Sequence, residues 1–154
     1  MQTFLPYGRD FEKSAACLDT KRLGKQRLEA NQILKALDTG QGWIHHPITK
    51  MWAGYENALK FYFNAILREW INRGFQNNFT FAKVGLGPLG FPRWLTEDSP
   101  IMAAHKASLS AKDHSHYNHL WPHIIPIYST NLWYNMEEDF WYTQEKGTSK
   151  KSPV

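Results

Sequence analysis

The chain is poor in the features that mark secreted and membrane proteins. It has one cysteine, Cys17, so no disulfide can form within the chain. No apolar run approaches the roughly 18 residues that a membrane-spanning helix needs. The first residues also lack the basic and apolar segments of a secretory signal. These absences predict a soluble, cytoplasmic protein that does not contact a membrane.

Recognisable metal and nucleotide motifs are equally scarce. Histidines at positions 114, 116, 119 and 123 are crowded together, but their spacing fits no standard zinc motif. We expect no metal and no cofactor, although these histidines leave a metal-dependent nuclease as one alternative. The segment from Gly85 to Gly90 matches G-x-G-x-x-G, but no strand precedes it and no helix follows it. A dinucleotide fold is therefore not predicted.

Aromatic residues and positive charge are present in excess. Seven Trp, seven Tyr and nine Phe in 154 residues are more than one small core needs, so some rings should face a ligand. Eighteen Lys and Arg against fourteen Asp and Glu give a net charge of +4. Such an excess indicates an anionic partner only where it is clustered, and the segment from Lys21 to Arg27 is a cluster of this kind.

This basic cluster lies in a segment, Leu18 to Asp38, whose pattern predicts one long amphipathic helix. Its apolar face holds Leu23, Ala30, Ile33, Leu34 and Leu37. Its polar face holds Lys21, Arg22, Lys25, Glu29 and Gln32. Glu29 is thus a single carboxylate among cations, and Gly24 leaves a gap through which a ligand could approach. The alternative is a solvated face with weak ion pairs of about 0.2 to 0.5 kcal/mol each.

The remaining pattern predicts an all-α fold of about three main helices joined by long loops. A short helix is expected from Asp10 to Cys17, a long one from Pro47 to Arg73, and another from Ser99 and Pro100 to Lys112. Residues 128 to 142 are rich in Trp and Tyr but are interrupted upstream by prolines, and no sheet is expected there. We predict one domain over residues 1–145 and a disordered tail over residues 146–154.

Several segments resemble a known family. Leu18-Asp19, Arg22-Leu23, Lys25, Arg27, Glu29 and Gln32-Ile33-Leu34 resemble the catalytic helix of the pyrimidine-dimer DNA glycosylases of the bacteriophage endonuclease V type. The segment Asn72 to Phe75 and the segment Pro100 to Lys112, which contains His105, extend the similarity in the same order. The resemblance implies an endonuclease V-type fold.

The same resemblance implies a chemistry for Glu29 and for the start of the chain. In this family an α-amine attacks the sugar carbon to form an imine, while a glutamate, here Glu29, assists sugar opening and later proton abstraction. An α-amine suits this role because its usual pKa, about 7.7 to 8.0, leaves a neutral fraction at physiological pH.

This chain departs from the family at two points. The family has Thr after Met1, whereas this chain has Gln2, whose size predicts that Met1 is retained. The family also has a basic residue directly before the catalytic glutamate, where this chain has Leu28. Met1 and Gln2 are therefore the candidate nucleophile positions. Lys21, Lys25 or direct hydrolysis by water remain alternatives.

Binding is expected to involve duplex DNA that contains a damaged or modified base, which must be extruded from the helix. The predicted DNA contacts are Lys21, Arg22, Lys25, Arg27, His46, Arg93, His105 and Lys106. We expect a monomeric glycosylase, with β-elimination at the abasic site as a possible second activity. The alternative function is a DNA-binding domain without catalysis. The sequence does not indicate which damaged base is recognised.

Overall fold

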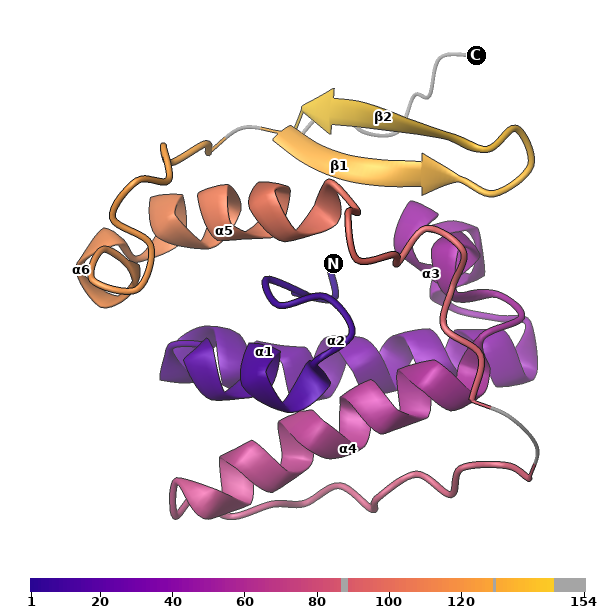
Figure 1. The fold of residues 1–154 in the computed structure, drawn as a ribbon. Coiled ribbons are helices and arrows are strands. Elements are labelled where there is room, and N and C mark those ends of the chain that lie inside the picture. Colours follow the sequence, from indigo (N-terminus) through magenta and orange to yellow (C-terminus); the bar gives the residue numbers. More distant parts are fainter. Residues whose placement is uncertain (87–88, 129, 146–154) are drawn as a thin grey trace.

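The computed structural model describes residues 1–86, 89–128 and 130–145, and the tail prediction for residues 146–154 lies outside them. Helices predominate in these residues, which confirms a mostly helical fold. The elements are α1 (Phe11–Cys17), α2 (Thr20–Thr39), the 3-10 helix η1 (Trp43–His45), α3 (Pro47–Trp52), α4 (Glu56–Asn72), α5 (Ile101–Lys112), α6 (His114–Tyr117), β1 (Thr130–Asn135) and β2 (Phe140–Glu145). In Figure 1 the N-terminal segment lies between a layer formed by α1, α2 and α4 and a second layer formed by α5 and the two strands.

Helix α2 forms largely as its sequence predicts. The side chain of Asp19 caps it by accepting from the backbone N–H of Arg22, and Gly40 ends it in the left-handed conformation at φ 72°. Leu23 and Ile33 are fully buried on the expected face. This helix packs against α4 and supplies one wall of the core.

The interpretation of Gly24 as a gap for a ligand is wrong. A Cβ atom at Gly24 would lie 3.2 Å from the ring of Trp70, so the missing side chain lets α2 and α4 approach each other. The glycine therefore serves helix packing. No space for a ligand opens at this point.

The predicted helix from Pro47 to Arg73 is two helices. Helix α3 ends at Trp52 and α4 begins at Glu56, with Gly54 between them at φ 88°. Positive φ is readily adopted by glycine and breaks a helix, so an apolar periodicity that continues across the break conceals the turn. Both helices nevertheless turn large apolar side chains into the core, because Trp52, Tyr62 and Ile66 are fully buried.

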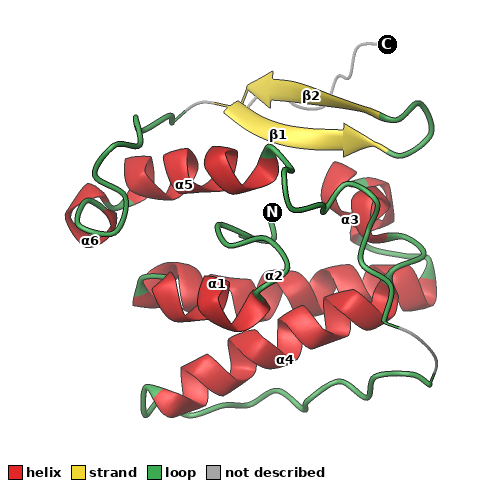
Figure 2. Cartoon of the chain, in the orientation of Figure 1, coloured by secondary structure: helices red, strands yellow, loops and turns green. Residues whose placement is uncertain are grey.

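The expectation of an all-α fold without a sheet is also wrong. Strands β1 and β2 pair in antiparallel register, with Trp133 opposite Tyr142 and Tyr134 opposite Trp141. Figure 2 shows this hairpin as the only strand-coloured part of the described chain, lying over α5. Trp and Tyr have high β propensity, and Trp133 is buried where β1 packs against α3 and α5.

Residues from the N-terminal arm (Met1 to Leu5), all the long helices and β1 share one core cluster. Helix α5 begins at Ile101, one residue later than predicted, and Ser99 Oγ accepts from the N–H of Ile101. Among the described residues no helix is both long and apolar enough to cross a membrane.

The buried junction of α2 and α6 gives a stability prediction. The hydroxyl of Tyr117 donates to Asp19 Oδ1 at 2.6 Å and accepts from the Asp19 N–H at 2.8 Å. Burial alone would raise the pKa of Asp19, but the hydrogen bond from Tyr117 and the ion pair with Arg22 outweigh it and lower that pKa.

We expect Tyr117→Phe to reduce the free energy of unfolding by about 1 to 3 kcal/mol at pH 7. A lowered carboxyl pKa stabilises the fold above the usual value of about 3.9, and this stabilisation is lost as pH falls through the folded-state pKa. The difference between wild type and variant should therefore narrow at pH 3. Urea unfolding at pH 7 and pH 3 measures this difference in unfolding free energy. Tyr128→Phe is the control, because Tyr128 is exposed. An unchanged difference would contradict the assigned role of Asp19.

Candidate active site

The N-terminal arm is anchored by side chains of α2 and α4. The N–H of Gln2 donates to Glu29 Oε1 at 2.8 Å, and its carbonyl accepts from Gln26 Nε2 at 3.0 Å. Further along, Gln26 Oε1 accepts from the N–H of Phe4 at 3.1 Å, and Tyr62 Oη donates to the Phe4 carbonyl at 3.0 Å. The start of the chain therefore has a defined position beside Glu29.

Two more contacts hold the arm from its other sides. Trp52 Nε1 donates to Thr3 Oγ1 at 3.1 Å, and the N–H of Leu5 donates to His105 Nδ1 at 2.8 Å. Thr3 and Leu5 are fully buried. The arm then turns at Pro6 to Gly8, where the N–H of Gly8 donates to the Leu5 carbonyl at 3.0 Å.

Glu29 is the carboxylate at the centre of this arrangement. It is half-buried, and besides the Gln2 N–H it faces Gln26 Nε2 at 3.5 Å. A carboxylate in contact with the nitrogen at the start of a chain can exchange protons with an amine there or with a ligand bound to it. The predicted pair of Glu29 and Gln2 is thus brought together across 27 residues of sequence.

His46 lies near the terminal amine. Burial, and to a smaller extent the positive charge of the N-terminus, together lower the pKa of His46 to about 4. Its Nδ1 accepts from the N–H of Ile48, so the neutral ring carries its proton on Nε2. The ring also contacts Trp43, which is 50% exposed, and buried Trp133 edge-on.

Three predicted basic residues share the Glu29 face of α2. Lys21 and Lys25 are exposed, and Arg22 is partly buried and pairs with Asp19 at 3.2 Å. Lys25 stands one turn from Glu29. Among the described residues, none of these cations forms an ion pair with Glu29.

The structure separates the other predicted contacts from Glu29. Arg27 stacks on Trp70 at 4.0 Å, with its buried Nε lacking a partner, and burial lowers its pKa. Arg93 pairs with Asp139 at 2.8 Å in the hairpin turn. Lys106 lies over the rings of Tyr7 and Trp121.

His105 was predicted at a DNA surface, whereas the structure buries it to 3% exposure. Burial lowers the pKa of His105 to about 3, so the ring is neutral at physiological pH. Because Nδ1 accepts from the N–H of Leu5, the proton is on Nε2, and within the described part of the chain this atom has no hydrogen-bond partner. His105 therefore does not meet a phosphate as a cation.

Sequence reasoning missed Gln26 and Tyr62. Gln26 is fully buried, lies on the apolar face of α2 three residues after Leu23, and joins the arm to Tyr62. A polar residue within an apolar stripe was the available signal, since a buried amide requires partners.

His116 and Cys17 have structural contacts. His116 Nε2 lies 2.9 Å from the carbonyl oxygen of Cys17, and burial raises the pKa of the Cys17 thiol to about 12. Within the described residues, no group of three or more His, Cys, Asp or Glu side chains is arranged to hold a metal ion.

The described residues thus place the start of the chain against the half-buried carboxylate of Glu29. A family model described as pyrimidine dimer DNA glycosylase matches residues 1–83, more than half of the 154-residue chain. The chain belongs to this family. The match includes the arm and helices α1 to α4 but neither α5 nor the hairpin. No curated protein and no solved structure matches the chain.

Gln26 provides a test of the arm's anchoring. We expect Gln26→Leu to lower the free energy of unfolding by more than about 2 kcal/mol, because it leaves the Gln2 carbonyl and the Phe4 N–H buried without partners. Amide hydrogen exchange at residues 2–5 should accelerate in parallel. Exposed Gln32→Leu on the same helix should change stability by less than about 0.5 kcal/mol. Slow exchange in the Gln26 variant would show that other contacts suffice.

Proposed function

We propose that this chain is a DNA glycosylase that excises a dimerised pyrimidine from duplex DNA, with an N-terminal amine as nucleophile and Glu29 as the acid and base. The observation that carries the proposal is the 2.8 Å contact between Gln2 N and Glu29 Oε1. Family membership supplies the substrate class. The buried arm supports the same conclusion, because its hydrogen bonds give the terminus a fixed position.

The proposed reaction balances in two stages. The neutral amine attacks the sugar C1′ as the glycosidic bond breaks, the base leaves with the electron pair, and the proton lost by the amine returns to the base. Glu29 then takes the second proton of the attacking nitrogen and gives it to the ring oxygen O4′ as the sugar opens to an imine. In the second stage Glu29 as a base removes a C2′ proton and the 3′ phosphate leaves with the electron pair of the C3′–O bond, which is the proposed lyase activity.

The nucleophilic amine can belong to either of two residues at the start of the chain, Met1 or Gln2. With Met1 retained, as Gln2 predicts, the nucleophile is the Met1 amine, one residue beyond the contact with Glu29 and close enough to His46 to affect its charge. With Met1 removed, the nucleophile is Gln2 N itself. The two cases differ by one residue in the mass of the trapped N-terminal peptide.

Lys21, Arg22 and Lys25 are proposed to hold the phosphates that flank the extruded nucleotide. They lie on the Glu29 face of α2, so phosphates held there would bring the sugar toward the carboxylate. Arg27, Arg93 and Lys106 are not assigned to these phosphates, because the structure separates them from Glu29: Arg27 stacks on Trp70, Arg93 pairs with Asp139 in the hairpin turn, and Lys106 lies over Tyr7.

Covalent trapping tests the chemistry. Borohydride should link the wild-type protein to duplex DNA that holds an abasic site, and peptide mass analysis should locate the link at Met1 or Gln2. Glu29→Gln should lower strand cleavage and dimer excision by at least about 100-fold while DNA affinity stays within about 3-fold. Affinity without trapping or excision in the wild type would favour the non-catalytic binding domain. Cleavage that a chelator abolishes would favour the nuclease.

The salt dependence of binding tests the basic cluster. Each lost phosphate contact should reduce the slope of log affinity against log salt by about 0.9. We expect the Lys21→Ala and Lys25→Ala double variant to lose about 2 units of slope. Lys35→Ala with Lys83→Ala is the charge-matched control, because both residues are exposed and lie by a different groove. Equal slopes for the two double variants would argue against a localised contact.

A further inference from the structure

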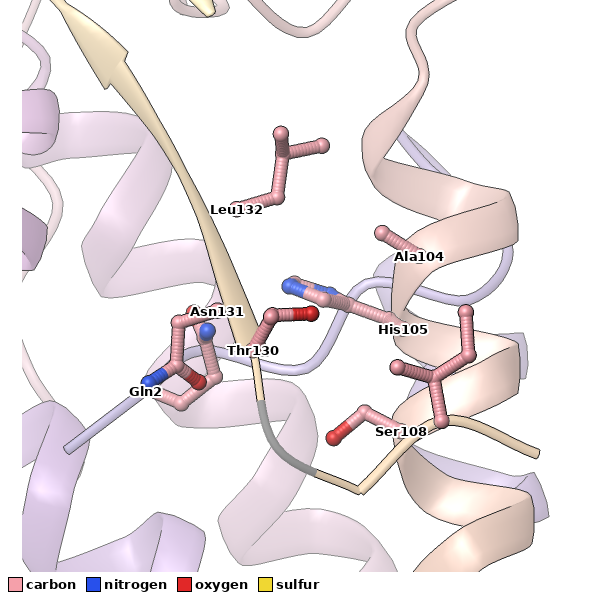
Figure 3. Close-up of a pocket in the computed structure, with 8 residues that line it drawn as sticks. Gln2, Ala104, His105, Ser108, Thr130, Asn131 and Leu132 are labelled. Carbon is pink, nitrogen blue, oxygen red and sulfur yellow. The ribbon is translucent and has the colours of Figure 1, made fainter. Parts of the chain in front are cut away.

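A small pocket adjoins the start of the chain on the side opposite α2. It is lined by Gln2, by Ala104, His105 and Ser108 of α5, and by Ile127 and the first residues of β1. Figure 3 shows the His105 ring extending from α5 toward Gln2 and Thr130. Its volume is about 50 Å³, and Ile127 at its edge is 48% exposed. This space admits one edge of a base or a water, but not a whole ring.

The pocket contains an unused hydrogen-bond donor of fixed orientation. His105 Nδ1 is occupied by the N–H of Leu5 at 2.8 Å, which leaves the ring proton on Nε2. Nε2 is buried and has no hydrogen-bond partner among the residues that the structure describes. A buried donor without an acceptor is costly to maintain, so a ligand oxygen is the natural partner.

Gln2 connects this donor to the proposed reaction. The same residue contacts Glu29 through its backbone nitrogen and lines the pocket. A base is bonded directly to the sugar carbon that the amine attacks. When the sugar carbon is beside Gln2, the edge of the base lies within reach of the pocket. The phosphates of the same nucleotide then face the exposed lysines of α2.

We propose that this pocket receives a carbonyl edge of the pyrimidine that is excised, and that His105 Nε2–H donates to its oxygen. This inference rests on the proposed glycosylase function. As the glycosidic bond breaks, the electron pair moves onto the base and its carbonyl oxygen gains negative charge. The donor stabilises that charge without transferring its proton, so the base departs more readily.

The test separates base departure from imine formation. Duplex DNA with a cyclobutane pyrimidine dimer requires the base to leave, whereas duplex DNA with a preformed abasic site does not. The measured quantity is the ratio of the single-turnover excision rate to the borohydride-trapping rate. This ratio cancels effects on the arm that are common to both reactions.

His105→Asn keeps an acceptor near Nδ1 for Leu5 but has no donor at the Nε2 position. We expect it to lower the ratio by about 10- to 100-fold. His105→Gln carries an amide N–H near the Nε2 position, so its ratio should stay within about 3-fold of wild type even where both rates fall.

Two further variants complete the experiment. Ala104→Leu fills the pocket while leaving His105 unchanged. It should lower the ratio of the excision rate to the trapping rate as His105→Asn does. This variant keeps the proposal testable if His105→Asn does not fold. Ser110→Ala is the matched control, because Ser110 is also buried and unpartnered on α5 but does not line the pocket. It should leave the ratio unchanged.

An unaltered ratio in both His105→Asn and Ala104→Leu would overturn the proposal and leave His105 as an anchor of the arm. A failure of the proposed function has a different signature, since the wild type would then neither excise the dimer nor become trapped.

Discussion

Four consecutive backbone N–H groups, from Gln2 to Leu5, each donate to a side chain, and this constraint determines the centre of the molecule. The acceptors are Glu29, the side chain of Gln2 itself, Gln26 and His105. An extended segment without a strand partner must find acceptors elsewhere, because buried N–H groups left unpaired are costly. Polar groups from α2 and α5 therefore enter a core that is otherwise apolar and aromatic.

Local patterns in the sequence predict the parts of the fold that depend on neighbouring residues. The cap at Asp19, the turn at Gly40 and the buried face of α2 follow from the chemistry of single turns. The break at Gly54 was concealed because apolar residues recur at helical spacing on both sides of it. The hairpin was missed because its pairing, Tyr134 with Trp141, is settled by contact with α3 and α5 and not by alternation within one strand.

The candidate site shows the same division. The position of Glu29 among cations is visible in the sequence, and the resemblance suggested its relation to the chain terminus. The roles of Gln26 and His105 depend on contacts with Phe4 and Leu5 across 22 and 100 residues of sequence. The periodicity of residues within one helix does not indicate which distant residues that helix contacts. Gly24 was misinterpreted for the complementary reason, since its partner Trp70 belongs to another helix.

Neutral histidine rings lie inside the molecule near the start of the chain, and exposed cations lie outside it. His46 and His105 each use Nδ1 to accept a backbone N–H, and burial keeps both rings neutral with the proton on Nε2. The cations Lys21 and Lys25 are exposed on the outer face of α2. Phosphates are attracted to exposed cations and gain much less from neutral donors, whereas a base edge needs donors without net charge. Under the proposed function, a nucleotide at this surface would place its phosphates at the rim and its base inward, which is the orientation that the proposed attack by a terminal amine beside Glu29 requires.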